Sequence, residues 1–171
     1  MSNTRTVAKW ILGSMDRIRP FAVAHAHCDI PCGIYDPHLA QVAAHTVIRM
    51  DMLIADAAKA GGTDIEARNK IARYIMIKEQ HAELCKHEIR VLWGDYFKPE
   101  HLQATPELHQ LVWDVMKLAS KAKQSTNIED GKALLAAVEK VAEAFWKTKN
   151  VKTKRVKAFY PTEQEIVYPV V

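Results

Sequence analysis

The sequence predicts an all-α protein that folds as one antiparallel four-helix bundle. The chain has 171 residues, with only 6 glycines and 7 prolines, whereas alanine, lysine, glutamate, leucine and valine are abundant. This composition favours helices over a set of short strands. Four stretches carry apolar or small residues at helical spacing, and each follows a helix-starting signal. Four amphipathic helices with short connections bury their apolar faces most economically as an antiparallel bundle.

The first two helices are separated by a glycine pair. Asp36-Pro37 is an N-cap followed by proline at the first helical position, and Gly61-Gly62 ends the run. Thr63-Asp64-Ile65-Glu66 has the capping-box pattern and starts a second helix, which we expect to continue as far as Asp95, with Pro99 ending any continuation. The apolar or small positions of the two helices are 39, 43, 46, 50, 53 and 57, then 71, 75, 82, 85, 89 and 92.

The last two helices complete a predicted bundle over 37–150. Thr105-Pro106-Glu107 starts the third helix and Asn127 caps the fourth. Cys85 falls on the apolar face of the second helix, so we expect it in the core. The C-terminal tail, 151–171, begins basic and ends apolar. Strand pairing, docking on a neighbouring subunit and disorder all remain open for this tail.

Charge is concentrated at the two ends of the chain. The net charge is +3 over 1–26, −1 over 27–150 and +2 over 151–171. A nucleic-acid-binding protein normally concentrates positive charge on its folded body, so we expect no nucleic acid as a partner. Three cysteines are too few for a disulfide scaffold, which favours a reducing compartment, the cytoplasm. No apolar run approaches the roughly 20 residues that span a bilayer, so we expect no membrane association.

Residues 1–26 differ from the rest of the chain. They are basic, contain only the short apolar stretch Trp10-Ile11-Leu12, and end in Ala24-His25-Ala26. Small residues at 24 and 26 fit a cleavage site, while the apolar stretch is too short for a secretory signal. We interpret 1–26 as a removable pro-segment. The alternative is an amphipathic N-terminal helix that stays attached.

Three potential metal ligands lie just before the first helix. His27, Cys28 and Cys32 supply one imidazole and two thiols, which are ligands for late transition metals. Pro31 stiffens the segment between the cysteines and Gly33 permits a tight turn after it. The local pattern leaves three interpretations open: structural zinc with His25 as a further ligand, an unmetallated or disulfide-forming cysteine pair, and a redox metal. His45, His87, His101 and His109 have no partners at ligand spacing, and we expect them to be solvated or capping.

The segment 27–37 resembles the metal hook of the nickel superoxide dismutase family. Further stretches that resemble this family follow in the same order: 27–37 (HCDIPCGIYDP), 77–84 (IKEQHAEL), 91–99 (VLWGDYFKP), 106–112 (PELHQLV) and 145–149 (FWKTK). The resemblance implies a nickel hook at 27–36 that precedes the first bundle helix, and a mature chain that begins at His27. It also implies a homohexamer and a processing peptidase that removes 1–26.

The resemblance implies one nickel ion per subunit. Its ligands would be the free α-amino group and imidazole of His27, the backbone amide nitrogen of Cys28, and the thiolates of Cys28 and Cys32. Anionic thiolate and amidate ligands stabilise the higher oxidation state, so that a Ni(II)/Ni(III) couple can both oxidise and reduce superoxide, giving oxygen and hydrogen peroxide. Cleavage before His27 would be obligatory, because an amide at this position lacks the lone pair of a free amine.

Other side chains resemble residues around the metal of this family. Tyr35, with Tyr96 as its neighbour, resembles the tyrosines that gate the metal. Backbone amides near Asp29 would orient the anion, and Lys98 would steer it. In this family a glutamate and an arginine hold the axial imidazole. The chain departs from the family at both positions, which are Ala43 and His81. We expect His81 to be a half-buried structural histidine more than a substitute for the arginine.

The sequence thus predicts an antioxidant oxidoreductase that disproportionates superoxide. The alternative is a non-catalytic helical module that binds zinc or nickel. A third hypothesis is a helical bundle that only interacts with other molecules and whose hook has lost its function.

Overall fold

The computed structural model describes residues 33–170, which form five α-helices, one π-helical turn and a two-stranded sheet. The elements in chain order are α2 His38–Ala60, α3 Ile65–Val91, η1 Leu92–Tyr96, α4 Pro99–Ala104, α5 Leu108–Gln124, α6 Ile128–Thr148, β1 Thr153–Lys157 and β2 Glu165–Pro169. The predicted pro-segment 1–26 and residues 27–32 of the predicted hook lie outside the described residues. Between residues 33 and 170, no helix is both long and apolar enough to cross a membrane.

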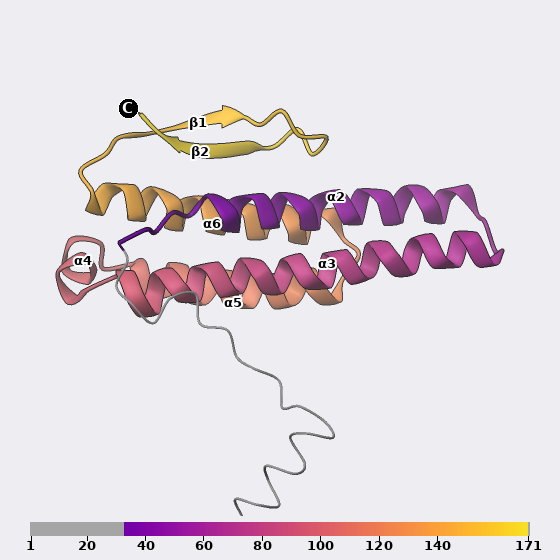
Figure 1. Cartoon of the computed structure of the whole chain (residues 1–171), viewed down its shortest axis with the longest axis horizontal. Helices are drawn as coiled ribbons and strands as arrows, with labels where there is room; N and C mark the ends of the chain where they lie inside the picture. The colour runs from indigo at the N-terminus through magenta and orange to yellow at the C-terminus, as the bar shows by residue number, and fades with distance from the viewer. Residues whose placement is uncertain (1–32, 171) are drawn as a thin grey trace, which may run out of the picture. The chain divides into compact units, whose positions relative to one another are not determined.

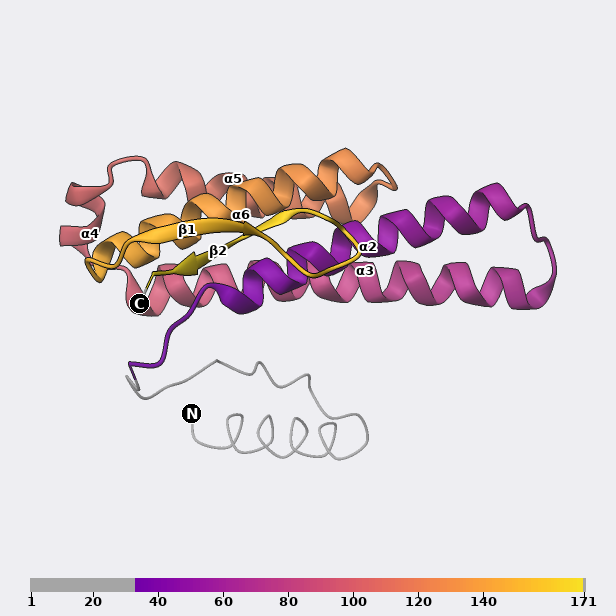
Figure 2. The same cartoon turned by 90° about the horizontal axis from the view of Figure 1, so that it is seen from above.

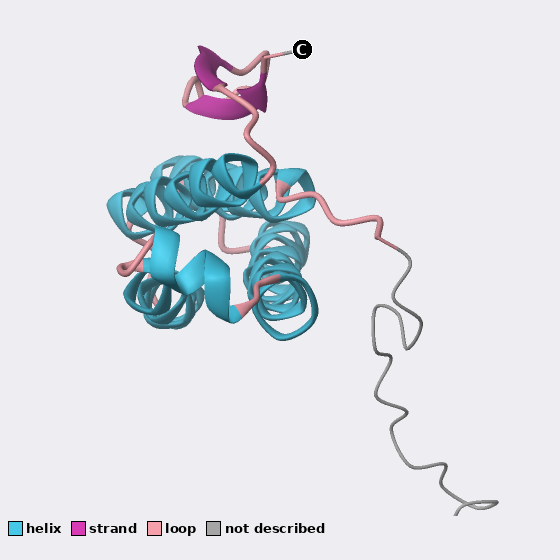
Figure 3. Ribbon diagram, turned by 90° about the vertical axis from the view of Figure 1, so that its left-hand side faces the viewer, coloured by secondary structure: helices cyan, strands magenta, loops and turns pink. Residues whose placement is uncertain are grey.

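The long helices pack in two layers, and the strands form a third (Figure 1). Helix α2 packs against α3 and α6, and α5 packs against the same two helices. The strands β1 and β2 lie over the layer formed by α2 and α6 (Figures 1 and 3). The α2–α3 pair extends beyond the ends of α5 and α6 (Figure 2). The prediction of a mostly helical fold is confirmed, and of the possibilities left open for the tail the structure shows strand pairing, which adds a small sheet to the helices.

Small and branched side chains fill the space between the helices. The core includes Ala40, Ala43, Ala44, Val47 and Ile48 from α2, Ala82, Cys85 and Ile89 from α3, Val112, Val115, Ala119 and Ala122 from α5, and Leu134, Leu135, Ala137, Val138, Val141 and Phe145 from α6. A side chain on Gly131 would place its Cβ 3.0 Å from Cγ1 of Ile48. Glycine at this position therefore allows α6 to approach α2 closely.

Two of the predicted helix boundaries are confirmed, and two caps are displaced by one residue. Pro37, not Asp36, is the N-cap residue of α2. The carboxylate of Asp36 accepts a hydrogen bond from the amide of His38 at 2.7 Å, where α2 begins. Gly61 ends α2 with a left-handed φ of 67°. Asn127 caps α6 by accepting from the amide of Glu129 at 3.1 Å. Helix α3 is capped by Asp64, not Thr63, because the carboxylate of Asp64 accepts from the amide of Ala67 at 2.8 Å.

The second predicted helix is interrupted before its expected end. Helix α3 ends at Val91 and passes into the π-helical turn η1, which the amide of Phe97 closes by donating to the carbonyl of Leu92 at 2.9 Å. Such turns insert one extra residue into a helix and rotate the side chains that follow. Pro99 then begins the short helix α4, although we expected it only to end a helix.

A buried ion pair ties α2 to α3. The ammonium group of Lys78 lies 3.1 Å from Oδ1 of Asp51, and both side chains are almost fully buried. Lys78 also donates to the carbonyl of Ser125, directly after α5. Oδ2 of Asp51 has no hydrogen-bond partner among the described residues. Burial raises the pKa of Asp51, whereas the hydrogen bond from Lys78 lowers it less strongly.

The tail folds back as an antiparallel β-hairpin. The strands pair Thr153 with Pro169 at one end and Lys157 with Glu165 at the other. Three residues of the hairpin are buried: Ala158, Ile166 and Val167. The hairpin therefore covers part of the helical layer and does not extend into solvent. His45 of α2 is buried against it, which corrects the expectation that this histidine is solvated or capping.

Candidate metal centre

The structure describes the exit from the predicted metal hook, Gly33–Pro37, but not the predicted ligands. His27, Cys28 and Cys32, together with Asp29, lie outside the described residues. Gly33 has a φ of 73°, a conformation that L-residues rarely adopt, so the backbone uses the conformational freedom of glycine at this position. The hydrogen bond from the amide of His38 to Asp36 then fixes the direction in which the chain enters α2.

Tyr35 and Tyr96 lie together, as the resemblance implied. Their ring centroids are 5.4 Å apart, at an interplanar angle of 51°. Tyr35 is half-buried against the helical core. Tyr96 reaches it from η1, so the π-helical turn contributes directly to this site. Tyr35 follows the predicted ligand Cys32 by three residues in the sequence.

The hydroxyl of Tyr96 is fixed by α6. The hydroxyl of Thr148 donates to the carbonyl of Phe145 at 2.7 Å. Thr148 therefore accepts from Tyr96, whose hydroxyl lies 2.6 Å away. The ring of Tyr96 also lies 4.6 Å from the ring of Phe145. These contacts hold Tyr96 in one orientation, with its ring available to Tyr35.

Two lysines differ in their relation to the tyrosine pair. Lys98 is exposed, and its backbone amide donates to Nδ1 of His101 at 3.1 Å. The ammonium group of Lys149 lies 5.2 Å from the centroid of the Tyr96 ring, which is cation–π geometry. Sequence reasoning missed Thr148 and Lys149, although both fall in the matching stretch 145–149. Only the fold shows that this stretch packs on Tyr96.

Ala43 and His81 provide no replacement pair for the missing glutamate and arginine. Ala43 is buried in the core, where its methyl group has no polar function. His81 is half-buried, and its Nδ1–H donates to the carbonyl of Ile77 on the same helix at 2.9 Å. This geometry agrees with the structural histidine that we expected.

The described residues offer no second metal site. Over 33–170, no group of three or more histidine, cysteine, aspartate or glutamate side chains is arranged to hold a metal ion. Cys85 is fully buried, as predicted, and burial raises the pKa of its thiol to about 12. A thiol with such a pKa is neither a good ligand nor a good nucleophile at neutral pH.

Comparison with known proteins gives consistent matches. The sequence profile described as nickel-containing superoxide dismutase matches residues 22–149. Over 130 residues the chain is 42% identical to superoxide dismutase [Ni] of Streptomyces coelicolor (strain ATCC BAA-471 / A3(2) / M145), and this covers 76% of the chain and 93% of that protein. The corresponding protein of Streptomyces seoulensis is 41% identical over 130 residues, with the same coverage. A native structure of nickel superoxide dismutase superposes with a TM-score of 0.62 at 43% identity, covering 72% of this chain and 99% of that one.

Proposed function

The chain belongs to the nickel-containing superoxide dismutase family, and from this premise we propose that His27, Cys28 and Cys32 hold its nickel. Its activity is superoxide dismutation and its cofactor is nickel. The observation that carries the proposal is that one imidazole and two thiols, at 27, 28 and 32, lie within the segment 22–149 that matches the family. The alternative of a non-catalytic metal-binding module is not favoured.

The chemistry of these donors fits nickel. Thiolates and an imidazole are polarisable ligands that late transition metals prefer, whereas magnesium and calcium prefer oxygen. Cleavage before His27 adds a free α-amino group to the same set, and the backbone amide of Cys28 completes it. The third cysteine, Cys85, is excluded from this role by its burial in the core. When bound, nickel would supply one-electron exchange between Ni(II) and Ni(III), so that one superoxide is oxidised to oxygen and another, with two protons, is reduced to hydrogen peroxide.

The protein's own residues would control how superoxide approaches the hook. Tyr35 and Tyr96 form an aromatic pair beside the exit from the hook, and this position suits them to limit the size of what enters. The backbone amide at Asp29 would donate to the anion. Positive charge on Lys98, and on Lys149 beside Tyr96, would raise the local concentration of an anionic substrate. These lysines act through the electrostatic field, so salt would weaken their effect.

The same proposal includes processing and assembly. A peptidase would remove 1–26 in the cytoplasm, because only a chain that begins at His27 has the amine ligand. The packing of α2, α3, α5 and α6 supports an antiparallel four-helix bundle as the scaffold of each subunit. Ile34 is 77% exposed and Leu39 is 55% exposed beside the exit from the hook. Apolar side chains in this position support an interface with a neighbouring subunit, and the family resemblance implies that such interfaces build a homohexamer in which neighbouring subunits cover each hook.

Cysteine substitutions test the proposed ligand set. Chains that begin at His27 and carry Cys28→Ser or Cys32→Ser should bind nickel much more weakly and lose superoxide dismutation. The matched control is Cys85→Ala, which removes a thiol from the core and should leave both properties intact once the protein is folded. Nickel content by mass spectrometry and superoxide decay by stopped flow give the two readouts. Retention of nickel and activity by Cys28→Ser would refute the ligand assignment.

A further inference from the structure

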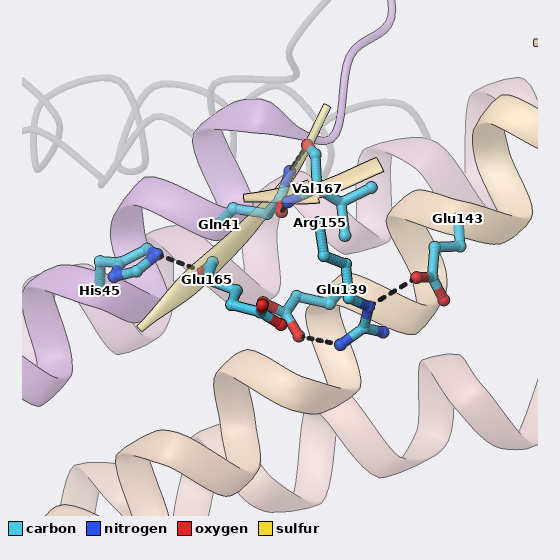
Figure 4. A network of polar contacts seen from close by, with 7 residues as sticks. All are labelled: Gln41, His45, Glu139, Glu143, Arg155, Glu165 and Val167. Carbon is cyan, nitrogen blue, oxygen red and sulfur yellow. Dashed lines mark hydrogen bonds and ion pairs between the residues drawn. The ribbon is translucent and has the colours of Figure 1, made fainter. Parts of the chain in front are cut away.

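The C-terminal hairpin lies beyond residues 22–149, the part of the chain that matches the family, yet it is attached to the helix that directly follows the hook. The side-chain amide of Gln41 donates to the carbonyl of Val167 at 3.1 Å, and the amide of Val167 donates to Oε1 of Gln41 at 2.8 Å. Nε2 of His45 donates to the carbonyl of Glu165 at 3.0 Å (Figure 4). Two side chains of α2 thus satisfy the outer edge of β2.

The spacing of these contacts explains their fit. Residues 41 and 45 are four apart on a helix, a rise of about 6 Å. Residues 165 and 167 are two apart on an antiparallel strand, a rise of about 7 Å. Successive outward-facing backbone groups of β2 therefore meet successive side chains on one face of α2. This face of the helix takes the place of a third strand.

The same hairpin is anchored to α6 on its other side. Arg155 of β1 donates to Glu139 at 2.7 Å and to Glu143 at 2.8 Å (Figure 4). Arg155 is the register partner of Val167 in the sheet. Of these two paired residues, Val167 is bonded to α2 and Arg155 is bonded to α6. The hairpin therefore bridges the two helices.

The end of β2 reaches the exit from the hook. The ring of Tyr168 lies 5.7 Å from the ring of His38, the first residue of α2. A hollow of about 220 Å³ separates this strand end from the start of α2, and its lining comprises Asp36, His38, Trp146, Val167, Tyr168 and Pro169. The hairpin therefore contacts His38 and shares the lining of this hollow with Asp36, the residue that joins the hook to α2.

We propose that the C-terminal hairpin is a positioning element for the metal hook. By fixing the first turn of α2 against α6, it sets where the chain enters the helix at Asp36 and hence how the preceding ligands are held. Gln41 and Tyr168 are its positioning residues; neither touches nickel or superoxide. The inference rests on the proposed function, because it takes 27–36 as the nickel site. A hairpin that only adds stability is the competing explanation.

The experiment uses nickel-loaded chains that begin at His27 and keep the hairpin. Gln41→Leu removes two of the three hydrogen bonds by which Gln41 and His45 attach β2 to α2, and Tyr168→Ala removes the ring beside His38. Tyr168→Phe keeps that ring and should restore wild-type behaviour. Phe159→Ala is the matched control, because Phe159 is a fully exposed aromatic residue of the same hairpin, in its connecting loop.

Nickel affinity and the EPR spectrum separate positioning from stability, and hydrogen exchange checks that the attachment has been loosened. Gln41→Leu and Tyr168→Ala should raise the nickel dissociation constant, measured by chelator competition, by roughly tenfold, near the lower end of losses caused by groups that orient ligands. They should also shift the EPR spectrum of the oxidised nickel and speed hydrogen exchange at the amides of 41–44. Phe159→Ala should change none of these. Tyr168→Ala is the milder variant and decides the question if Gln41→Leu does not fold.

Two negative results are distinguishable. If wild-type protein disproportionates superoxide but Tyr168→Ala shows an unchanged EPR spectrum and nickel affinity, the hairpin is only a stabilising element and the inference is wrong. If the wild-type chain binds nickel without disproportionating superoxide, the proposed function itself fails.

Discussion

The side chain of Gln41 binds both backbone groups of Val167, a residue 126 positions later in the chain. Gln41 is 1% exposed, so neither water nor another side chain can replace it at this contact. A primary amide is suited to the role because it carries one donor and one acceptor, the complement of a peptide group. This contact joins the beginning of the helical layer to the tail of the chain.

Gln41→Leu should lower the free energy of unfolding by about 2–6 kcal/mol, because it leaves the amide and carbonyl of Val167 buried and unsatisfied, at about 1–3 kcal/mol for each group. Urea denaturation gives the value. Gln110→Leu is the control, since Gln110 is exposed and bonds to Asp114 on its own helix; its effect should stay within about 0.5 kcal/mol. Equal effects of the two substitutions would contradict the account.

His45 should make stability fall as the pH is lowered. Burial lowers its pKa below the usual 6.5, and the nearby charge of His38 lowers it further, while the hydrogen bond to the carbonyl of Glu165 opposes this. Neutral His45 accepts from the hydroxyl of Thr162 and donates to Glu165. Below pH 6.5 the unfolded chain takes up a proton that the folded chain does not, so stability is lost until the pH reaches the lowered pKa.

The measurement for His45 compares urea midpoints at pH 7.5 and pH 5. The wild-type protein should lose more stability between these values than His45→Gln, which does not titrate there. Equal losses would mean that the folded protein protonates His45 as easily as the unfolded chain does.

Lys78→Met should destabilise the protein by about 3–5 kcal/mol, because it leaves the carboxylate of Asp51 buried without a partner. The double variant Asp51→Leu with Lys78→Met removes both charges and should recover part of that loss. Chemical denaturation of the two variants tests the pair. A double variant that is less stable than Lys78→Met alone would show that the two residues do not act as a buried pair.

Cys85 should resist alkylation in the folded protein. Burial raises the pKa of its thiol to about 12, so almost no thiolate exists at pH 8, and the side chain is inaccessible. Iodoacetamide labelling followed by peptide mass spectrometry should show modification of Cys85 only after denaturation. Rapid labelling of the native protein would indicate that α3 opens locally.

Helix starts and stops were largely predictable, because the signals are local. Asp36, Gly61 and Asn127 act within one turn of the residues that they cap. Thr63 and Asp64 are adjacent residues with the same capping ability, and only the backbone conformation decides between them. The π-helical turn at Leu92–Tyr96 lies at the end of the long second helix, where no further helical turns follow in the same helix to show a shifted spacing, so periodicity alone does not reveal it.

Long-range contacts could not be predicted in this way. The strand Thr153–Lys157 is held in place by the ion pairs of Arg155 with two glutamates of α6. Its partner strand is held by hydrogen bonds from Gln41 and His45. Nothing in the local sequence pairs these residues. The Tyr35–Tyr96 contact was anticipated from family resemblance alone, whereas Thr148 and Lys149 became visible beside Tyr96 only when the helices were in place.

The most direct test of the proposed metal site compares two chains that differ by one residue. One begins at His27 and the other at Ala26, so that the second places an amide where the first has a free amine. Both keep every side chain of the hook and are loaded with nickel under identical conditions, and superoxide decay is followed by stopped flow. We predict rapid dismutation by the chain that begins at His27 and none above the metal-free protein by the other. Equal activity of the two chains would contradict the account.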